Sequence, residues 1–181
     1  LVESFRFPRK VVKVKCELPS KFQLKRFFDG LSGLRDKALF LFLASSGLRV
    51  GEALSLRRGN IDFSRRMVIP NCHSGRTKRS WVTFYNCECE ELLLKYLDSH
   101  GLDWVFPVSR KRVDHVWHET SIKTGVKITP QTLREWFCCE MGRLGVPDRY
   151  VDAFCGRVPQ TVLARHYTDC LLYTSDAADE G

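Results

Sequence analysis

The chain has 181 residues, 44% of them hydrophobic, and a formal net charge of +8 with a pI ≈ 9.2. This length and composition fit one globular domain with a hydrophobic core. The longest apolar run covers only residues 38–44. This run is too short for a membrane-spanning helix, which needs roughly 18 apolar residues. A basic surface attracts polyanions, of which nucleic acid is the commonest; simple solubility is the alternative explanation of the charge.

The first 19 residues are basic and contain Pro8 and Pro19, which prevent a continuous helix. We therefore expect residues 1–19 to form a linker or arm. The chain begins with Leu1 rather than Met, and we expect it to be a piece of a longer protein.

Two helices are predicted next. Ser20 is placed to cap a helix over residues 20–28, and Ser32 a second, apolar helix over residues 34–45. Gly47 follows the second helix and is expected to end it.

Three short segments that are rich in β-branched or aromatic residues predict strands, at residues 61–63, 66–70 and 81–85. The connection between the last two, residues 71–79, contains Ser74-Gly75 and three cations. We expect this connection to be the mobile tip of a hairpin.

The rest of the chain predicts helices over residues 88–99, 110–119, 131–144, 149–154 and 160–167. Pro130 suits the first turn of the third of these helices, Gly145 ends it, and Asp148 caps the fourth. The predicted fold class is therefore mainly α with a small antiparallel β-sheet (α+β), over a domain of residues 20–169. Residues 170–181 are small and polar, and we expect a disordered tail or a foreign junction.

The eight cysteines do not follow the spacing of zinc sites. Cys87 and Cys89 are separated by one residue and Cys138 and Cys139 are adjacent, whereas zinc knuckles use C-x2-C pairs. We expect no metal and mainly buried thiols that pack as small apolar residues. Disulfides remain open if the source is a hyperthermophile.

Arg49 lies in SGLRVGEALSL, residues 46–56, between two glycines that allow a sharp turn of the backbone. A short helix is predicted over residues 50–56, with Glu52 one turn from Arg49 and able to hold its guanidinium. Arginine offers a planar fork of donors that matches two phosphate oxygens. An ordinary surface arginine at a helix start is the alternative.

Four segments together resemble the motifs of the tyrosine recombinases, the phage-integrase family. SGLRVGEALSL is similar to the first arginine motif of that family, and GRTKRSWVTF, residues 75–84, to its β-hairpin lysine motif. TPQTLREWF, residues 129–137, resembles the second arginine motif, and FCGRVPQTVLARHYTD, residues 154–169, the terminal box with its tyrosine. The terminal box, with Arg in the Leu-Gly-His position, looks most similar to integrases of archaeal fuselloviruses.

The resemblance implies a catalytic domain with a tyrosine nucleophile and a set of cations. Tyr167 would attack the scissile phosphorus to form a 3′-phosphotyrosyl bond, and its phenol, with an ordinary pKa of about 10, needs cations or a base nearby. Arg49 and Arg134 would bind the non-bridging oxygens, and Lys78 would protonate the leaving 5′-oxygen. The phosphotyrosyl bond conserves the bond energy of the cleaved phosphodiester, so that the strand can be rejoined without an energy source. The resemblance therefore implies no ATP, metal or other cofactor.

Two positions depart from the family pattern. Gln131 stands where the second motif has His or Lys, and Arg157 stands where the third has His or Trp. If both face the phosphate, fixed groups replace titratable ones, and the pH dependence should follow Lys78 and Tyr167.

Other side chains compete for these roles. His166 adjoins Tyr167 and is an alternative base, although adjacent helical residues point about 100° apart. Tyr173 is a second candidate nucleophile in the anomalous tail, whereas Tyr85 and Tyr150 are interpreted as packing residues.

The implied partner is double-stranded DNA at an attachment site, bound by a homo-oligomer, a tetramer, in the cytoplasm of a host cell and not at a membrane. One rival is a type IB topoisomerase-like enzyme, which uses a similar phosphotyrosine. Another is a basic DNA-binding module that is inactive because of Gln131 and Arg157.

Overall fold

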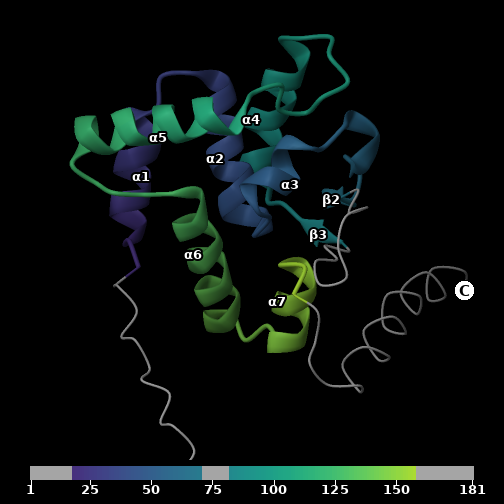
Figure 1. Ribbon diagram of the computed structural model, residues 1–181. Helices are drawn as coiled ribbons and strands as arrows, with labels where there is room; N and C mark the ends of the chain where they lie inside the picture. Colours follow the sequence, from purple (N-terminus) through teal and green to yellow (C-terminus); the bar gives the residue numbers. More distant parts are fainter. Residues whose placement is uncertain (1–17, 71–81, 158–181) are drawn as a thin grey trace, which may run out of the picture.

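The computed structural model describes residues 18–70 and 82–157 (Figure 1). Three predicted segments lie wholly outside these ranges: the hairpin connection over residues 71–79, the helix over residues 160–167 and the tail over residues 170–181. Of the predicted arm over residues 1–19, only residues 18 and 19 are described. The described helices are α1 (Lys21–Gly30), α2 (Leu34–Ser46), α3 (Val50–Leu54), the 3-10 turn η1 (Arg58–Asn60), α4 (Cys87–Asp98), α5 (Arg110–Thr124), α6 (Pro130–Arg143) and α7 (Asp148–Phe154). The described strands are β1 (Ile61–Asp62), β2 (Met67–Val68) and β3 (Thr83–Phe84).

Helix α2, the predicted apolar helix, lies at the centre of the core. It packs against α4 and α6, while α5 packs against α1 (Figure 1). Aromatic rings fill the interior: Phe27 stacks on Phe40, and Phe42 meets the edge of Phe106. No helix within the described residues is long and apolar enough to cross a membrane.

The three strands form one antiparallel sheet in the order β1-β2-β3. Ile61 pairs with Val68, and Val68 pairs in turn with Thr83. The predicted fold class, mainly α with a small antiparallel sheet, is confirmed, although each strand is shorter than its sequence pattern indicated.

The sequence placed most helix boundaries within a few residues, and one cap is confirmed in detail. The Ser20 hydroxyl accepts from the backbone N–H of Gln23, whose side chain accepts from the N–H of Ser20. The Ser32 cap is wrong: α2 begins at Leu34 with Gly33 as its cap residue, so Ser32 lies one residue too early. The Asp148 cap is also wrong, because Asp148 is the first residue of α7 and Pro147 precedes it.

Helix α5 is longer than predicted because its last turn is buried. Thr120 and Thr124 are both buried and their hydroxyls donate to the carbonyls of Val116 and Thr120. A Cβ atom built on Gly30 would lie 2.4 Å from the Cγ2 of Thr124. Helix α5 was predicted from its sequence to end at residue 119. Its packing against the end of α1 explains why it continues to Thr124.

Gly47 ends α2 in a left-handed conformation, with φ of 66°, and its N–H donates to the carbonyl of Leu43. A Cβ atom at this position would lie 2.4 Å from Cδ1 of Phe137 on α6. The sharp turn after α2 therefore needs glycine both for its backbone angle and for the contact with α6.

We predict that Gly47→Ala lowers the free energy of unfolding by about 2–4 kcal/mol, from the left-handed backbone and from the overlap with Phe137. Gly125→Ala is the matched control, because Gly125 has φ of 69° but nothing within 4 Å of its Cβ position. That variant should lose only about 1–2 kcal/mol. Chemical denaturation measures both, and equal losses would show that the Phe137 contact adds nothing.

Candidate active site

Arg134 is the buried centre of the site. It lies on α6, whose first turn is formed by Pro130 and capped by the Thr129 hydroxyl, which accepts from the N–H of Thr132. Only 4% of Arg134 is exposed. Its Nη1 donates to the carbonyl of Gly47 at 2.5 Å, and its Nη2 donates to the carbonyl of Cys155. Arg134 therefore joins the turn after α2 to the turn after α7.

Each of these two turns is followed by a further arginine, two residues after the carbonyl that Arg134 binds. Arg49 follows Gly47 and is the cap residue of α3. The Glu52 carboxylate accepts from Nη1 of Arg49 and from its backbone N–H, both at 2.8 Å, as the spacing predicted. The Arg49 side chain remains 34% exposed. Only Gly47 of the two flanking glycines makes the turn, since Gly51 lies within α3.

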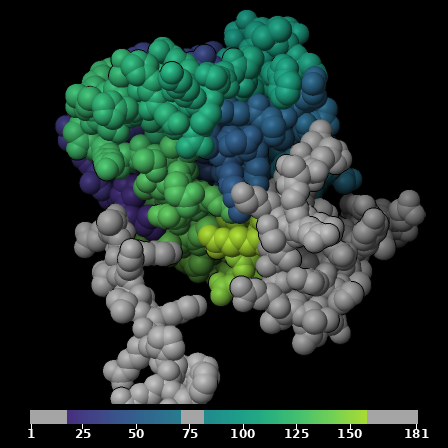
Figure 2. Space-filling view, viewed as in Figure 1, coloured from purple at the N-terminus to yellow at the C-terminus, as the bar shows by residue number. Residues whose placement is uncertain are grey.

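Arg157 follows Cys155 and is 48% exposed at its side chain. Its Nη1 donates to the Asp152 carboxylate at 3.2 Å and its Nη2 lies 3.6 Å from Sγ of Cys138. Its backbone N–H donates to the carbonyl of Asp152 at 2.8 Å. The guanidinium is thus held at the end of α7, which adjoins α6 on the face seen in Figure 2.

The charges of Arg49 and Arg157 act on the buried guanidinium of Arg134. Burial lowers the pKa of the Arg134 guanidinium, and the positive charges of Arg49 and Arg157 lower it further. Arginine stays charged in proteins all the same. Fixed guanidinium cations around two backbone turns are chemically suited to an anion with several oxygens, such as a phosphodiester.

The small sheet is attached to the same two turns. The Thr83 hydroxyl on β3 donates to the carbonyl of Ser46, the residue before Gly47, at 2.6 Å. The ring of Phe84 packs edge to face against the ring of Phe154, the residue before Cys155, with 5.8 Å between the ring centroids. The base of the β2–β3 hairpin is therefore fixed beside the arginines, and Lys78 belongs to the connection between these strands, outside the described residues.

Some of the other candidate site residues lie within the described residues and some lie outside them. Gln131 is exposed on the first turn of α6, where its Nε2 donates to Glu135 at 3.1 Å. Tyr85 is buried, and burial raises its pKa to about 12, which agrees with a packing residue. Tyr150 is half-buried against Arg149. Tyr167, His166 and Tyr173 lie outside the described residues.

Sequence reasoning missed two cysteines beside the arginines. The Sγ atoms of Cys138 and Cys155 are 3.5 Å apart. Cys138 lies four residues after Arg134, a spacing that places both on one side of a helix and was the available signal. The expectation of mainly buried thiols holds for Cys89 and Cys155 but is wrong for Cys87 and Cys139, which are exposed.

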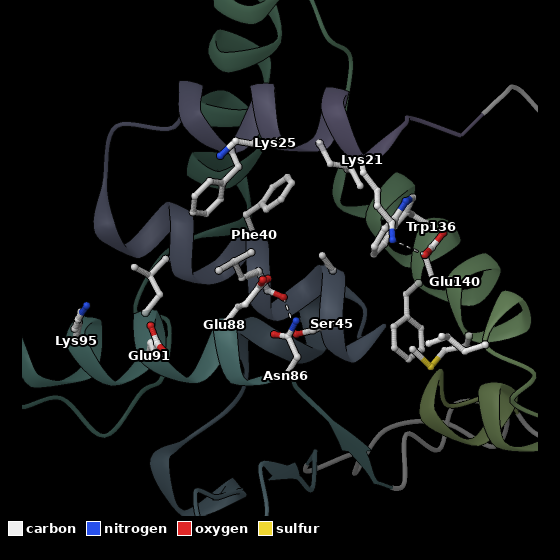
Figure 3. Close-up of a pocket in the computed structure, with 18 residues that line it drawn as sticks. Lys21, Lys25, Phe40, Ser45, Asn86, Glu88, Glu91, Lys95, Trp136 and Glu140 are labelled. Atoms are coloured by element: carbon white, nitrogen blue, oxygen red, sulfur yellow. Dashed lines mark hydrogen bonds and ion pairs between the residues drawn. The ribbon is translucent and has the colours of Figure 1, made fainter.

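A separate groove of about 740 Å³ lies between α1, α2, α4 and α6 (Figure 3). Phe40 and Trp136 are among its apolar walls, and Lys21 pairs with Glu140 at 3.5 Å on its rim. None of the three arginines is among the residues that line it. Its apolar walls suit hydrophobic side chains rather than a phosphate.

The sequence that builds this arginine cluster matches the Phage integrase family over residues 20–171. The chain belongs to that family. The match includes every element that positions the three arginines.

Among curated proteins, this integrase-family chain is similar to the tyrosine recombinase XerD of Neisseria meningitidis serogroup B, with 30% identity over 172 residues. That alignment covers 82% of this chain and 57% of the XerD protein. The tyrosine recombinase XerA of Thermococcus onnurineus is 28% identical over 133 residues, covering 67% of this chain and 46% of that protein. The chain thus spans about half the length of the curated relatives it matches.

Solved structures of integrase-family proteins share its fold. A crystal structure of XerA recombinase superposes with a TM-score of 0.68 at 23% identity, covering 97% of this chain and 67% of that one. The integrase of transposon Tn1549 in complex with circular intermediate DNA superposes with a TM-score of 0.65 at 14% identity, covering 86% and 62%. At these identities the likeness concerns the fold of a tyrosine recombinase catalytic domain.

Proposed function

We propose that this chain is the catalytic part of a site-specific tyrosine recombinase that cleaves and rejoins DNA through a 3′-phosphotyrosyl intermediate. The observation that carries the proposal is the arginine cluster, in which buried Arg134 binds the turns that carry Arg49 and Arg157. Membership in the phage integrase family supports the same chemistry. The proposed domain covers residues 20–169, between an N-terminal basic arm and a short C-terminal tail.

The proposed roles follow from charge and position. Arg49 and Arg157, the more exposed cations, would bind the non-bridging phosphate oxygens, on which charge develops during attack. A guanidinium has five N–H donors, and two of those of Arg134 bind backbone carbonyls. Arg134 would donate its remaining N–H groups to the phosphate. Tyr167 would attack the phosphorus and Lys78 would protonate the leaving 5′-oxygen.

Gln131 would have the smallest role. It can donate a hydrogen bond to a phosphate oxygen but cannot transfer a proton. Its bond to Glu135 occupies one amide N–H and leaves the second N–H for a phosphate oxygen.

The proposed partner is a double-stranded DNA attachment site, bound by a homotetramer within the host cell. XerH recombinase has been solved bound to its difH substrate, and the Tn1549 integrase with circular intermediate DNA. The net charge of +8 favours the same partner. The narrower resemblance to archaeal fusellovirus integrases rests on the terminal box with Arg157. The curated relatives XerD and XerA support the family and not this subgroup.

A nicked suicide substrate tests the proposal. When the strand beyond the scissile phosphate can diffuse away, a recombinase is trapped as a covalent protein–DNA adduct, which denaturing electrophoresis detects. Binding of the attachment-site DNA without any adduct would instead favour the inactive DNA-binding module.

The topoisomerase alternative is separated by product analysis. Supercoiled plasmids with and without an attachment site are incubated with the protein. A recombinase gives strand-exchange products only where sites are present, whereas a type IB topoisomerase-like enzyme relaxes both plasmids.

A further inference from the structure

Two thiols that the proposed chemistry does not use lie against the arginine cluster. Cys138 is on α6, one turn after Arg134, and Cys155 follows α7. Their Sγ atoms are 3.5 Å apart. Cys155 is fully buried and Cys138 is partly exposed, so only Cys138 is accessible to a reagent from solution.

The surroundings give the two thiols different chemistry. A hydrogen bond from Cys155, with the charges of Arg157 and Arg134, lowers the pKa of Cys138 below that of an ordinary cysteine. The same hydrogen bond and burial raise the pKa of Cys155. Cys138 is the more acidic of the two thiols, it lies 3.5 Å from Cys155 and accepts from Nη2 of Arg157, and the thiolate is the reactive form of cysteine.

Cys155 is also joined to the cluster through its backbone. Its carbonyl accepts from Nη2 of Arg134, and the chain reaches Arg157 two residues later. A movement of Cys155 is therefore transmitted to both arginines.

We propose that Cys138 and Cys155 form a thiol modification site, which low-molecular-weight disulfides such as oxidised glutathione convert to an intramolecular disulfide that displaces the arginines. The Cys138 thiolate attacks one sulfur of oxidised glutathione, breaks its S–S bond and releases one glutathione thiolate. Loss of a proton from Cys155 then lets its sulfur attack Sγ of Cys138, which releases the second glutathione. Two protein thiols are oxidised and one glutathione disulfide is reduced to two glutathiones.

The disulfide changes the cluster in two ways. The sulfurs must approach by about 1.5 Å, from 3.5 Å to bonding distance, which pulls on the turn that Arg134 and Arg157 share. The thiolate that accepts from Arg157 is also lost. On the proposed function, we expect this displacement to slow DNA cleavage by about 10²-fold.

The experiment compares the purified chain equilibrated in reduced and oxidised glutathione. Trypsin separates the two thiols, because residues 135–143 and 150–157 form different peptides, and mass spectrometry detects them joined. Cys138→Ala removes the reactive thiol. Cys139→Ala is the matched control: it removes the exposed neighbouring thiol of the same peptide and should leave the crosslink intact.

The expected result is a crosslink in wild type and Cys139→Ala that is absent in Cys138→Ala. Amide exchange at residues 155–157 should become faster, because the displaced turn weakens the bonds of these three N–H groups. Suicide-substrate cleavage should fall about 10²-fold on oxidation and recover with dithiothreitol. Absence of the crosslink, or a crosslink that changes neither exchange nor cleavage, overturns the proposal. If the reduced protein does not cleave, the proposed function fails, while the crosslink and amide exchange still decide on the thiol site.

Discussion

Tyr167→Phe is expected to abolish the covalent protein–DNA adduct, with cleavage reduced on the order of 10⁶-fold, to below detection. The phenylalanine ring keeps the shape of tyrosine but has no oxygen to bond to phosphorus. DNA binding should persist, because the phosphate contacts come from the cations, which the substitution leaves in place. Electrophoretic mobility shift measures binding, and the suicide substrate measures cleavage.

Two further variants distinguish the nucleophile from its alternatives. Tyr173→Phe is the matched control and should retain the adduct. His166→Ala tests whether a histidine is the base. A rate–pH profile with an ionisation at about 6.5 that this variant removes would contradict the prediction that the pH dependence follows Lys78 and Tyr167. An adduct that survives in Tyr167→Phe and is lost in Tyr173→Phe would place the nucleophile in the tail.

Arg134→Ala is expected to destabilise the fold as well as to stop cleavage. The substitution leaves the carbonyls of Gly47 and Cys155 without their donors in a buried region, at about 1–3 kcal/mol each. We expect a loss of about 2–5 kcal/mol in unfolding free energy and a melting temperature lower by about 5–15 °C. Thermal denaturation followed by circular dichroism measures this.

Arg157→Ala is the control that separates charge from structure. The Arg157 side chain is about half exposed and its ion pair with Asp152 lies at the surface, so its loss should cost less than about 1 kcal/mol. Cleavage should still fall by about 10²–10³-fold if the guanidinium stabilises the transition state. Equal melting temperatures for Arg134→Ala and Arg157→Ala would contradict the structural role of Arg134.

Local chemistry made much of the fold predictable. The Ser20 cap, the stop at Gly47 and the bond between Arg49 and Glu52 each depend on residues at most four positions apart, and all are confirmed. The misplaced caps at Ser32 and Asp148 are local errors of one residue, whereas the length of α5 depends on packing between distant segments. The last turn of α5 is held by contact with Gly30 rather than by its own propensity.

The candidate site was likewise predicted only in part from the sequence. The order and spacing of the motifs pointed to the arginines, but not to the manner in which they are held. Arg134 contacts Gly47, which is 87 residues away, and Cys155, which is 21 residues away. No pattern within a helix or strand indicates such bonds.

The sequence by itself determined the kind and order of most described elements, the basic charge and the identity of the candidate cations, because these depend on side-chain chemistry and short-range spacing. The tertiary structure alone decided that Arg134 is a buried bridge, that Arg49 and Arg157 stand on the two turns it joins, and that Cys138 meets Cys155. The physical reason is that a buried guanidinium needs acceptors, and folding supplied them from backbone carbonyls far apart in the chain.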